Sequence, residues 1–285
     1  MASYRFRLLN VFAETPLGGN PLAVFEDARG LDDATLQALA RQFNLSETTF
    51  ILPATTPDAT ARVRIFTPDF EMPFAGHPTL GTAHVVRALL ATGDTVKLEM
   101  PAGIIPVAAI GDRWQLTANA AAVRPASSTR AQVAQALGLA VTDIAGEPLW
   151  VNTGSEQFVV PLVDIAAVRR CRPDTALLER YCHNGQRAMV YVWASDDAGQ
   201  RQHAEVRFFF PKGGATVEDP GTGSACANLG GYLLATGVKP PFSLTLLQGT
   251  QIDKPCVLAL DVTADGDIRV GGRVFELGAG EIHLP

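Results

Sequence analysis

The sequence lacks the features that mark membrane, secreted and nucleic-acid-binding proteins. No apolar run approaches the roughly 18 residues that a membrane span needs, and the first residues carry no apolar segment of signal-peptide length. The four cysteines form no C-x-x-C pair and no dense disulfide framework. With 23 Lys and Arg against 29 Asp and Glu, the formal charge is −6. We therefore expect a cytoplasmic protein with reduced thiols that binds neither membranes nor nucleic acids.

The chain also lacks the motifs of bound nucleotides, metal ions and serine nucleophiles. Gly221-Thr222-Gly223 has no third glycine of a dinucleotide fingerprint, and Lys212-Gly213-Gly214 lacks the Walker arrangement. Gly223-Ser224-Ala225 is not the nucleophile elbow of hydrolases. His77 and His84 stand about 10.5 Å apart along a helix, too far to share one metal ion. We therefore predict that the protein uses no cofactor and no metal.

What the sequence does have is an internal echo. Residues 61–68 align with residues 204–211 at an offset of 143, matching at alanine, valine, arginine, the second aromatic and proline. In both places a Gly- and Pro-rich loop follows, and then a predicted helix. The two helices end on the same pentapeptide, Leu-Leu-Ala-Thr-Gly, at residues 89–93 and 233–237. We predict a pseudo-twofold, two-lobed architecture.

The composition and the pattern of the elements together predict the fold class. With 47% hydrophobic and 18% charged residues, the chain of 285 residues can form an ordered core in one large or two smaller domains. Small residues fill both echoed helices, as expected for helices buried inside a sheet. Strand-like segments lie at residues 6–12, 22–25, 50–52, 158–162, 190–193 and 244–247, and outer helices at 32–43 and 131–139. The predicted class is α+β, each lobe a curled β-sheet around a central helix.

We place the boundary between the two lobes in the polar, Pro- and Ser-containing stretch 124–129. The first lobe then spans residues 1–124 and the second spans 125–285. The tail, about residues 274–285, is expected to pack back on the first lobe.

The two echoed helices begin at glycine-rich turns that are candidate anion sites. They open at Gly76-His77-Pro78-Thr79 and at Gly221-Thr222-Gly223-Ser224. The first amides of a helix lack intrahelical partners and lie at the positive end of its dipole. If the pseudo-twofold holds, the two turns face each other across a cleft between the lobes and bind a small anion. The alternative is ordinary side-chain capping by Thr79 and Ser224.

Three titratable residues are candidates for chemistry. His77 lies inside the first turn and Asp219 precedes the second, where each could reach a bound ligand. The alternatives are a structural histidine and an Asp-Pro that initiates a turn. Glu47 lies between the helical pattern and the strand at residues 50–52. It is either a surface loop carboxylate or a base held in an apolar cleft.

The sequence resembles the PhzF family of phenazine-biosynthesis proteins, within the wider superfamily of diaminopimelate epimerase. The most specific motifs are Gly76-His77-Pro78-Thr79, and Glu218-Asp219-Pro220 with the Gly-Thr-Gly-Ser that follows. Further matches cover essentially the whole chain: Val11-Phe12, Gly19-Asn20-Pro21-Leu22-Ala23-Val24-Phe25, Ser46-Glu47-Thr48-Thr49-Phe50, Phe66-Thr67-Pro68 with Glu71, and Asn152-Thr153-Gly154.

This resemblance implies roles for the candidate residues. Glu47 resembles the family's acid/base, which moves a proton on a dihydro-hydroxyanthranilate ring. His77, Asp219 and Ser224 resemble its substrate-binding and proton-handling groups. The family's fold has two lobes, each a β-sheet wrapped on a central helix, with the active site between them, and its members commonly form homodimers. A homodimer that acts on a small-molecule carboxylate is therefore the expectation here.

Two further positions separate the sequence from the epimerase and proline-racemase branches of the superfamily. Those enzymes carry cysteines before the glycine turns, whereas this chain has Ala75 and Pro220. Gly76 and Gly223 would leave the helix N-termini open to a ligand, because glycine has no side chain. The leading hypothesis is a cofactor-independent isomerase that moves a proton between carbons of a small carboxylate. The alternatives are an amino-acid racemase or epimerase, and a non-catalytic carboxylate-binding protein.

Overall fold

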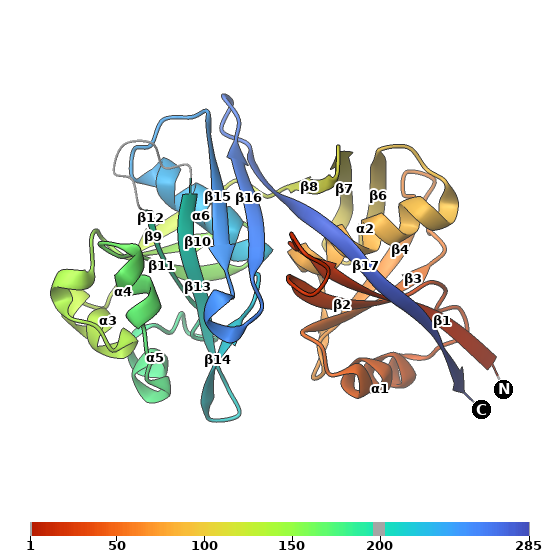
Figure 1. The fold of residues 1–285 in the computed structure, drawn as a ribbon, viewed down its shortest axis with the longest axis horizontal. Coiled ribbons are helices and arrows are strands. Elements are labelled where there is room, and N and C mark those ends of the chain that lie inside the picture. Colours follow the sequence, from red (N-terminus) through yellow and green to blue (C-terminus); the bar gives the residue numbers. More distant parts are fainter. Residues whose placement is uncertain (1, 196–202, 285) are drawn as a thin grey trace. The chain divides into compact units, whose positions relative to one another are not determined.

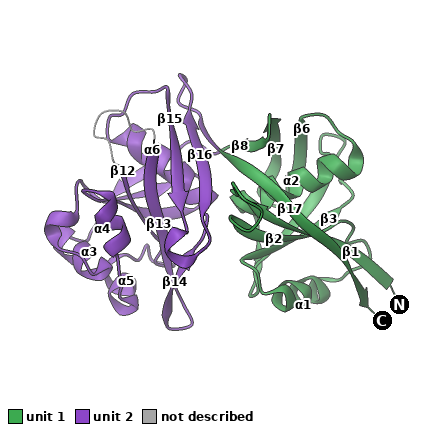
Figure 2. Ribbon diagram, in the orientation of Figure 1, with its two compact units in different colours: residues 1–117, 271–285 green, residues 118–270 purple. Residues whose placement is uncertain are grey.

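The structure is a computed structural model that describes residues 2–195 and 203–284. Figure 1 shows the course of the chain. The chain divides into two compact units, coloured separately in Figure 2. Unit 1 comprises residues 1–117 and 271–285, and unit 2 comprises residues 118–270. The chain therefore leaves unit 1 after Thr117 and returns to it after Val270.

Unit 1 is a ring of strands around one helix. Its strands are β1 (Ala2–Val11), β2 (Asn20–Phe25), β3 (Glu47–Leu52), β4 (Ala61–Phe66), β5 (Glu71–Met72), β6 (Thr95–Met100), β7 (Gly103–Ile110), β8 (Arg113–Thr117) and most of β17 (Ile268–Leu284). Pairing runs β1-β2-β3-β4-β6-β7-β8-β17 and returns to β1, so the ring is closed. Closure leaves no unpaired edge along this ring.

Helix α2 (Gly76–Leu90) fills the ring, where nine of its residues are buried. Its small residues let the surrounding strands approach closely. A Cβ on Gly81 would lie 2.5 Å from Leu22 Cδ2 and 2.9 Å from Val11 Cγ2, so any larger residue would force these buried side chains to shift. The prediction of a central helix rich in small residues, buried inside a sheet, is confirmed for this unit.

Helix α1 (Asp33–Phe43) covers the outside of unit 1. Asp32 caps it by accepting a hydrogen bond from the Thr35 amide. Its apolar side packs on an aromatic cluster in which Phe25 and Phe50 stack with their ring centres 4.9 Å apart. The helix predicted at residues 32–43 is confirmed, and its amphipathic pattern has the expected buried side.

Unit 2 repeats the plan with more outer helices. Its elements are β9 (Ala122–Pro125), α3 (Arg130–Leu137), the 3₁₀ turn η1 (Val141–Asp143), β10 (Leu149–Asn152), β11 (Glu156–Pro161), α4 (Ile165–Arg170), α5 (Thr175–Tyr181), β12 (Val190–Ser195), β13 (His203–Lys212), β14 (Ala215–Asp219), α6 (Gly223–Ala235), β15 (Phe242–Gln248), η2 (Thr250–Ile252) and β16 (Cys256–Val262). Helix α6 is the central helix. A Cβ on Gly231 would lie 2.4 Å from Ala121 Cβ.

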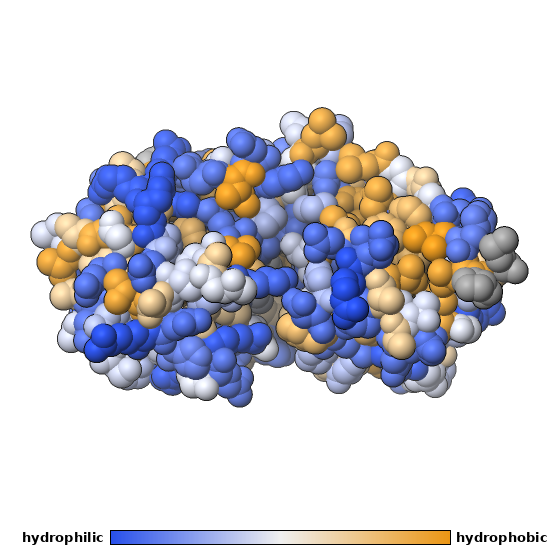
Figure 3. All heavy atoms as spheres, turned by 90° about the horizontal axis from the view of Figure 1, so that it is seen from below, coloured by the Kyte–Doolittle hydropathy of each residue, from blue (hydrophilic) through white to orange (hydrophobic). Residues whose placement is uncertain are grey.

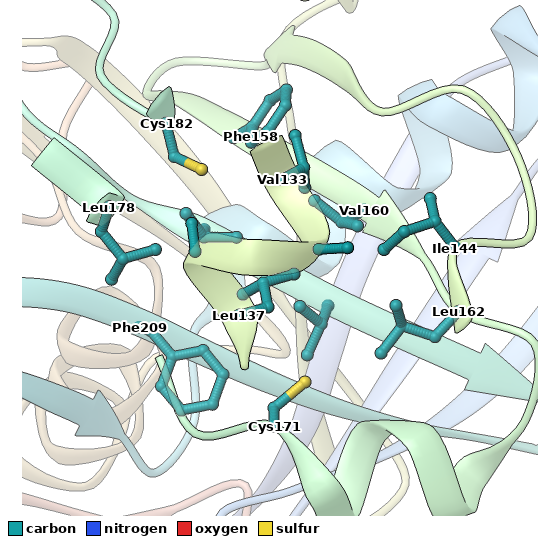
Figure 4. Packing of buried hydrophobic residues seen from close by; sticks show 14 of the residues in the cluster. Val133, Leu137, Ile144, Phe158, Val160, Leu162, Cys171, Leu178, Cys182 and Phe209 are labelled. Atoms are coloured by element: carbon teal, nitrogen blue, oxygen red, sulfur yellow. The ribbon is translucent and has the colours of Figure 1, made fainter. Parts of the chain in front are cut away.

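Helices α3, α4 and α5 enclose a second core outside the sheet of unit 2. Figure 4 shows Val133 and Leu137 packing among side chains that include Cys171, Cys182 and Phe209. The burial of these apolar side chains holds the outer helices against the strands beneath them. The free cysteines of this core are packing residues.

The internal echo corresponds to a true structural repeat. Strand β4 pairs antiparallel with β3 and β5 and parallel with β6, and β13 pairs in the same way with β12, β14 and β15. In register, Phe66 lies opposite Glu71, and Phe209 lies opposite Glu218. The predicted α+β class with two similar halves is confirmed.

The surface carries mixed hydropathy. Figure 3 shows hydrophilic residues interspersed with apolar ones on one face. Of the large apolar residues that the structure describes, Leu17 is the most exposed, at 79%. Within residues 2–195 and 203–284, no helix is both long and apolar enough to cross a membrane.

Candidate active site

In unit 1 the fold brings Glu47 and His77 together. Glu47 is the first residue of β3, and His77 is the second residue of α2. His77 Nδ1 lies 3.5 Å from Glu47 Oε2 and 3.5 Å from Asn20 Nδ2. The side chains of His77 and Glu47 are 6% and 15% exposed. Glu47 is therefore a mostly buried carboxylate beside an imidazole, which excludes the alternative of an exposed loop carboxylate.

Burial keeps the imidazole of His77 neutral. Desolvation lowers the pKa of His77 to about 3, and a hydrogen bond with the Pro21 carbonyl opposes this only partly. Among the described residues, His77 Nε2 has no hydrogen-bond partner. The imidazole therefore carries one N–H donor and one acceptor nitrogen, and it does not hold a positive charge near pH 7.

The N-terminus of α2 is left without a side-chain cap. The N-cap residue is Ala75, and in the described chain no side chain accepts a hydrogen bond from the first turn, which also has no acidic residue. The hydroxyl of Thr79 instead donates to the Ala75 carbonyl at 2.6 Å. The alternative of capping by Thr79 is thus wrong, because a hydroxyl that donates to a carbonyl is turned away from the free amides.

In unit 2, Asp219 ends β14 and is held by its neighbours. The hydroxyl of Thr222 donates to Asp219 Oδ2. Gln248 Nε2 donates to the Asp219 carbonyl at 2.8 Å and to Thr222 Oγ1 at 2.9 Å, while its Oε1 accepts from the Thr222 amide at 3.2 Å. Gln248 is fully buried. These bonds fix the carboxylate at the start of α6, as the position of Asp219 before the helix predicts.

The N-terminus of α6 also lacks a side-chain cap among the described residues. Its N-cap residue, Thr222, carries a hydroxyl, but that group is used on Asp219. Ser224 Oγ accepts a hydrogen bond from Gln157 Nε2 at 2.8 Å. Capping by Ser224 is thus wrong as well. The outer helices differ, since Asp32, Thr129, Asp164 and Asp174 cap α1, α3, α4 and α5.

The sequence interpretation missed the buried amides beside these residues. Asn20, Gln157, Asn228 and Gln248 are each at most 3% exposed. Asn20 lies within a family motif, yet no role was assigned to it. The available signal was an amide inside an otherwise apolar strand or helix, because buried polar groups need a hydrogen-bond partner and so mark a built network.

The thiols have no place in this site. All four cysteines are buried and unpaired by disulfides. Burial raises the pKa of Cys171 and Cys182 to about 12, and it raises the pKa of Cys226 and Cys256 further. Cys226 therefore packs as a small apolar residue, as expected. In the part of the chain that the structure describes, no group of three or more His, Cys, Asp or Glu side chains could hold a metal ion.

Comparison with known proteins identifies the relatives of this chain. The family model for phenazine biosynthesis-like proteins, PhzC-PhzF, matches residues 9–275. An uncharacterized isomerase of Pasteurella multocida is 41% identical over 100% of this chain and 96% of its own. A trans-2,3-dihydro-3-hydroxyanthranilate isomerase of Pseudomonas aeruginosa is 33% identical over 95% of this chain and 99% of its own.

A solved structure shows the same fold. The phenazine biosynthesis protein of Bacillus anthracis, from the PhzF family, superposes with a TM-score of 0.88 at 23% identity and covers 100% of both chains. The chain thus belongs to the PhzF family of isomerases. The resemblance inferred from the motifs is confirmed.

Proposed function

We propose that this protein is a cofactor-independent isomerase of the trans-2,3-dihydro-3-hydroxyanthranilate isomerase type, acting on a small carboxylate with Glu47 as the acid/base. Glu47 takes a proton from one substrate carbon, and the electron pair of that C–H bond forms a new C=C bond. The neighbouring C=C bond of the substrate opens, and its electron pair forms the new C–H bond with the proton that the protonated Glu47 returns to the far carbon. Atoms and charge balance without a redox partner.

The observation that carries this proposal is the pairing of Glu47 with the neutral His77. A carbon acid is weak, so its base must be well positioned and shielded from water. Glu47 is 15% exposed and lies 3.5 Å from His77. The uncapped amides at the start of α2 and α6 suit a carboxylate. Asp219 is the second proton-handling group in this proposal.

The racemase alternative is less well supported. Two-thiol racemisation needs cysteines at positions that here hold Ala75 and Pro220. The buried thiol of Cys226 is no substitute, because burial raises its pKa. A non-catalytic carboxylate-binding protein would need the helix N-termini but not a buried carboxylate at position 47, so Glu47 also disfavours that alternative.

The test follows deuterium from solvent into the product. Trans-2,3-dihydro-3-hydroxyanthranilate is incubated in D₂O with the wild type, Glu47→Gln and Cys226→Ala, and carbon-bound deuterium is measured by mass spectrometry. The wild type and Cys226→Ala should incorporate deuterium, and Glu47→Gln should be slower by about 10² to 10⁴-fold. An active Glu47→Gln with an inactive Cys226→Ala would refute the proposed base and the reaction class.

A second measurement applies if the natural substrate is a different carboxylate. Small carboxylic acids are screened for thermal stabilisation, in which a ligand at 100 times its Kd adds about 2.7 kcal/mol. Any stabilising acid is then tested for deuterium exchange. The absence of a cofactor requirement, a cytoplasmic location and a homodimeric assembly stay predictions; exhaustive chelation should leave turnover intact.

A further inference from the structure

A directed chain of hydrogen bonds leads to Ser224 through the interior of unit 2. The Thr153 amide and hydroxyl donate to Asn228 Oδ1 at 2.9 and 2.8 Å. Asn228 Nδ2 donates to the Ser155 carbonyl at 2.9 Å and to Gln157 Oε1 at 2.8 Å. Gln157 Nε2 then donates to Ser224 Oγ at 2.8 Å. The chain joins the loop between β10 and β11, strand β11 itself and the first turns of α6.

The direction of this chain is fixed by the backbone at its start. A backbone N–H can only donate, so the atom of Asn228 that faces the Thr153 amide is oxygen. A backbone carbonyl can only accept, so the atom that faces the Ser155 carbonyl is nitrogen. The NH₂ group of Asn228 therefore donates to Gln157, so the atom of Gln157 that accepts is its oxygen. The NH₂ group of Gln157 then faces Ser224.

We propose that Gln157 and Asn228 are positioning residues that hold Ser224 as a hydrogen-bond donor and thereby select a ligand group that accepts, such as a carboxylate oxygen. Ser224 Oγ receives a hydrogen bond from Gln157, so its own hydrogen is directed to another acceptor. Gln157 is 2% exposed and Asn228 is fully buried, so neither can be reoriented without leaving a buried polar group unsatisfied.

This inference rests on the proposed function, because it takes the ligand to be the proposed carboxylate. It goes beyond that proposal in assigning roles to two residues inside the fold and in fixing the polarity of the ligand group at Ser224. It also predicts that Gln157 acts only through Ser224, which a general structural role would not require.

The first experiment needs no ligand. Ser224→Ala, Gln157→Leu and the double variant are compared by thermal unfolding. Ser224→Ala leaves the NH₂ group of Gln157 without its partner, and Gln157→Leu leaves Ser224 Oγ and one N–H of Asn228 without theirs. The bond between Gln157 and Ser224 is lost in both variants, so the loss of Tm in the double variant should be smaller than the sum of the two single losses. Additive losses would overturn the positioning role of Gln157. The side-chain amide protons of Gln157 should also shift in the NMR spectrum of Ser224→Ala.

The second experiment measures binding of 3-hydroxyanthranilate, a stable aromatic carboxylate, by calorimetry. Ser224→Ala should weaken binding about 10-fold or more, as expected for a lost hydrogen bond to a charged group. Gln157→Leu should weaken it several-fold, and the double variant should bind no more weakly than Ser224→Ala. Gln37→Leu, which removes an amide bonded to the Thr67 carbonyl in unit 1, is the control with unchanged affinity.

The outcomes separate the two proposals. Full additivity of Gln157→Leu and Ser224→Ala in binding would overturn the positioning role while leaving the isomerase proposal intact. Normal ligand binding and non-additive effects of Gln157→Leu and Ser224→Ala, without deuterium exchange, would overturn the isomerase proposal. The positioning role of Gln157 would then still hold. A wild type that does not bind 3-hydroxyanthranilate would overturn the assignment of a carboxylate of this type at Ser224, and the unfolding comparison would still decide the positioning role of Gln157.

Discussion

Both repeats contain the same arginine–glutamate ion pair, which joins the two strands that precede the central helix. In unit 1, Arg64 donates to both oxygens of Glu71 at 2.7 and 2.6 Å, and in unit 2, Arg207 donates to both oxygens of Glu218 at 3.0 and 2.7 Å. Each guanidinium also lies over the ring two residues further along its strand, at 5.0 Å in unit 1 and 4.7 Å in unit 2. The shared pair ties the strand before each central helix to its neighbour.

The repeats differ where the chemistry is expected. Phe66 lies opposite Thr48, and its counterpart in unit 2 lies opposite Val190, so Glu47 corresponds to Met189. By the same register, Asp219 corresponds to Met72. Each unit thus carries a carboxylate where the other carries methionine. The Arg–Glu pair is duplicated, but the carboxylates of Glu47 and Asp219 are not, so each candidate proton-transfer group of the proposed function occurs in one unit only.

The largest expected effect comes from moving the carboxylate between the repeats. Glu47→Met should reduce deuterium incorporation by about 10² to 10⁴-fold, and adding Met189→Glu should not restore it, because the second residue of the central helix is His77 in unit 1 but Ser224 in unit 2. Met189→Leu is the control and should keep the wild-type rate. Recovery of activity in the double variant would show that the two positions are interchangeable.

The two arginine–glutamate ion pairs should differ in their contribution to the free energy of unfolding. The side chains of Arg207 and Glu218 are 7% and 8% exposed, against 15% and 31% for Arg64 and Glu71. Removing one partner of a buried pair leaves an uncompensated charge and costs about 3 kcal/mol, whereas a more exposed pair contributes about 1 kcal/mol. Urea unfolding of Glu218→Gln and Glu71→Gln measures both. Equal losses would contradict the comparison.

Much of the fold could be predicted because short stretches of the sequence indicate its strands and helices. The echo at residues 61–68 and 204–211 marks the strands of the repeat, and the small residues around Gly81 and Gly231 mark helices that other elements touch. The closed ring of unit 1 could not be predicted in the same way. It depends on β17 pairing with both β1 and β8, which are far away in the sequence.

The candidate site was only partly predictable. The motifs identified Glu47, His77 and Asp219, and the structure gives each a polar neighbour. The absence of helix caps was harder to predict. Thr222 has the side chain of an N-cap residue, but its hydroxyl is hydrogen-bonded to Asp219 and Gln248 instead. A sequence shows which residues can cap a helix, but the competing partner comes from a distant strand.

The burial of His77 predicts a difference between native and unfolded chains in acid. Its native pKa is about 3, below its ordinary value of 6.5, so between these values only the unfolded chain binds the proton and stability falls as the pH falls. At pH 5 this costs about 2 kcal/mol. His77→Asn should lose less stability from pH 7 to pH 5 than the wild type, while His183→Asn, at an exposed position, should behave as the wild type does. Parallel curves for His77→Asn and wild type would contradict the burial of a neutral imidazole.

The smallest expected effect concerns the contrast between the capped outer helices and the uncapped central ones. Ala75 is the N-cap residue of α2 and has the extended backbone, φ −151° and ψ 141°, that a capping side chain requires. Ala75→Ser should therefore stabilise the protein by about 0.5 to 1 kcal/mol, raising Tm by about 2 °C, while Asp32→Ala at α1 should cost about 1 kcal/mol. Because the new hydroxyl would occupy an amide that the proposed ligand needs, Ala75→Ser should also bind 3-hydroxyanthranilate more weakly. A variant that is stabilised yet binds as tightly as the wild type would show that the α2 terminus is uncapped for some reason other than ligand binding.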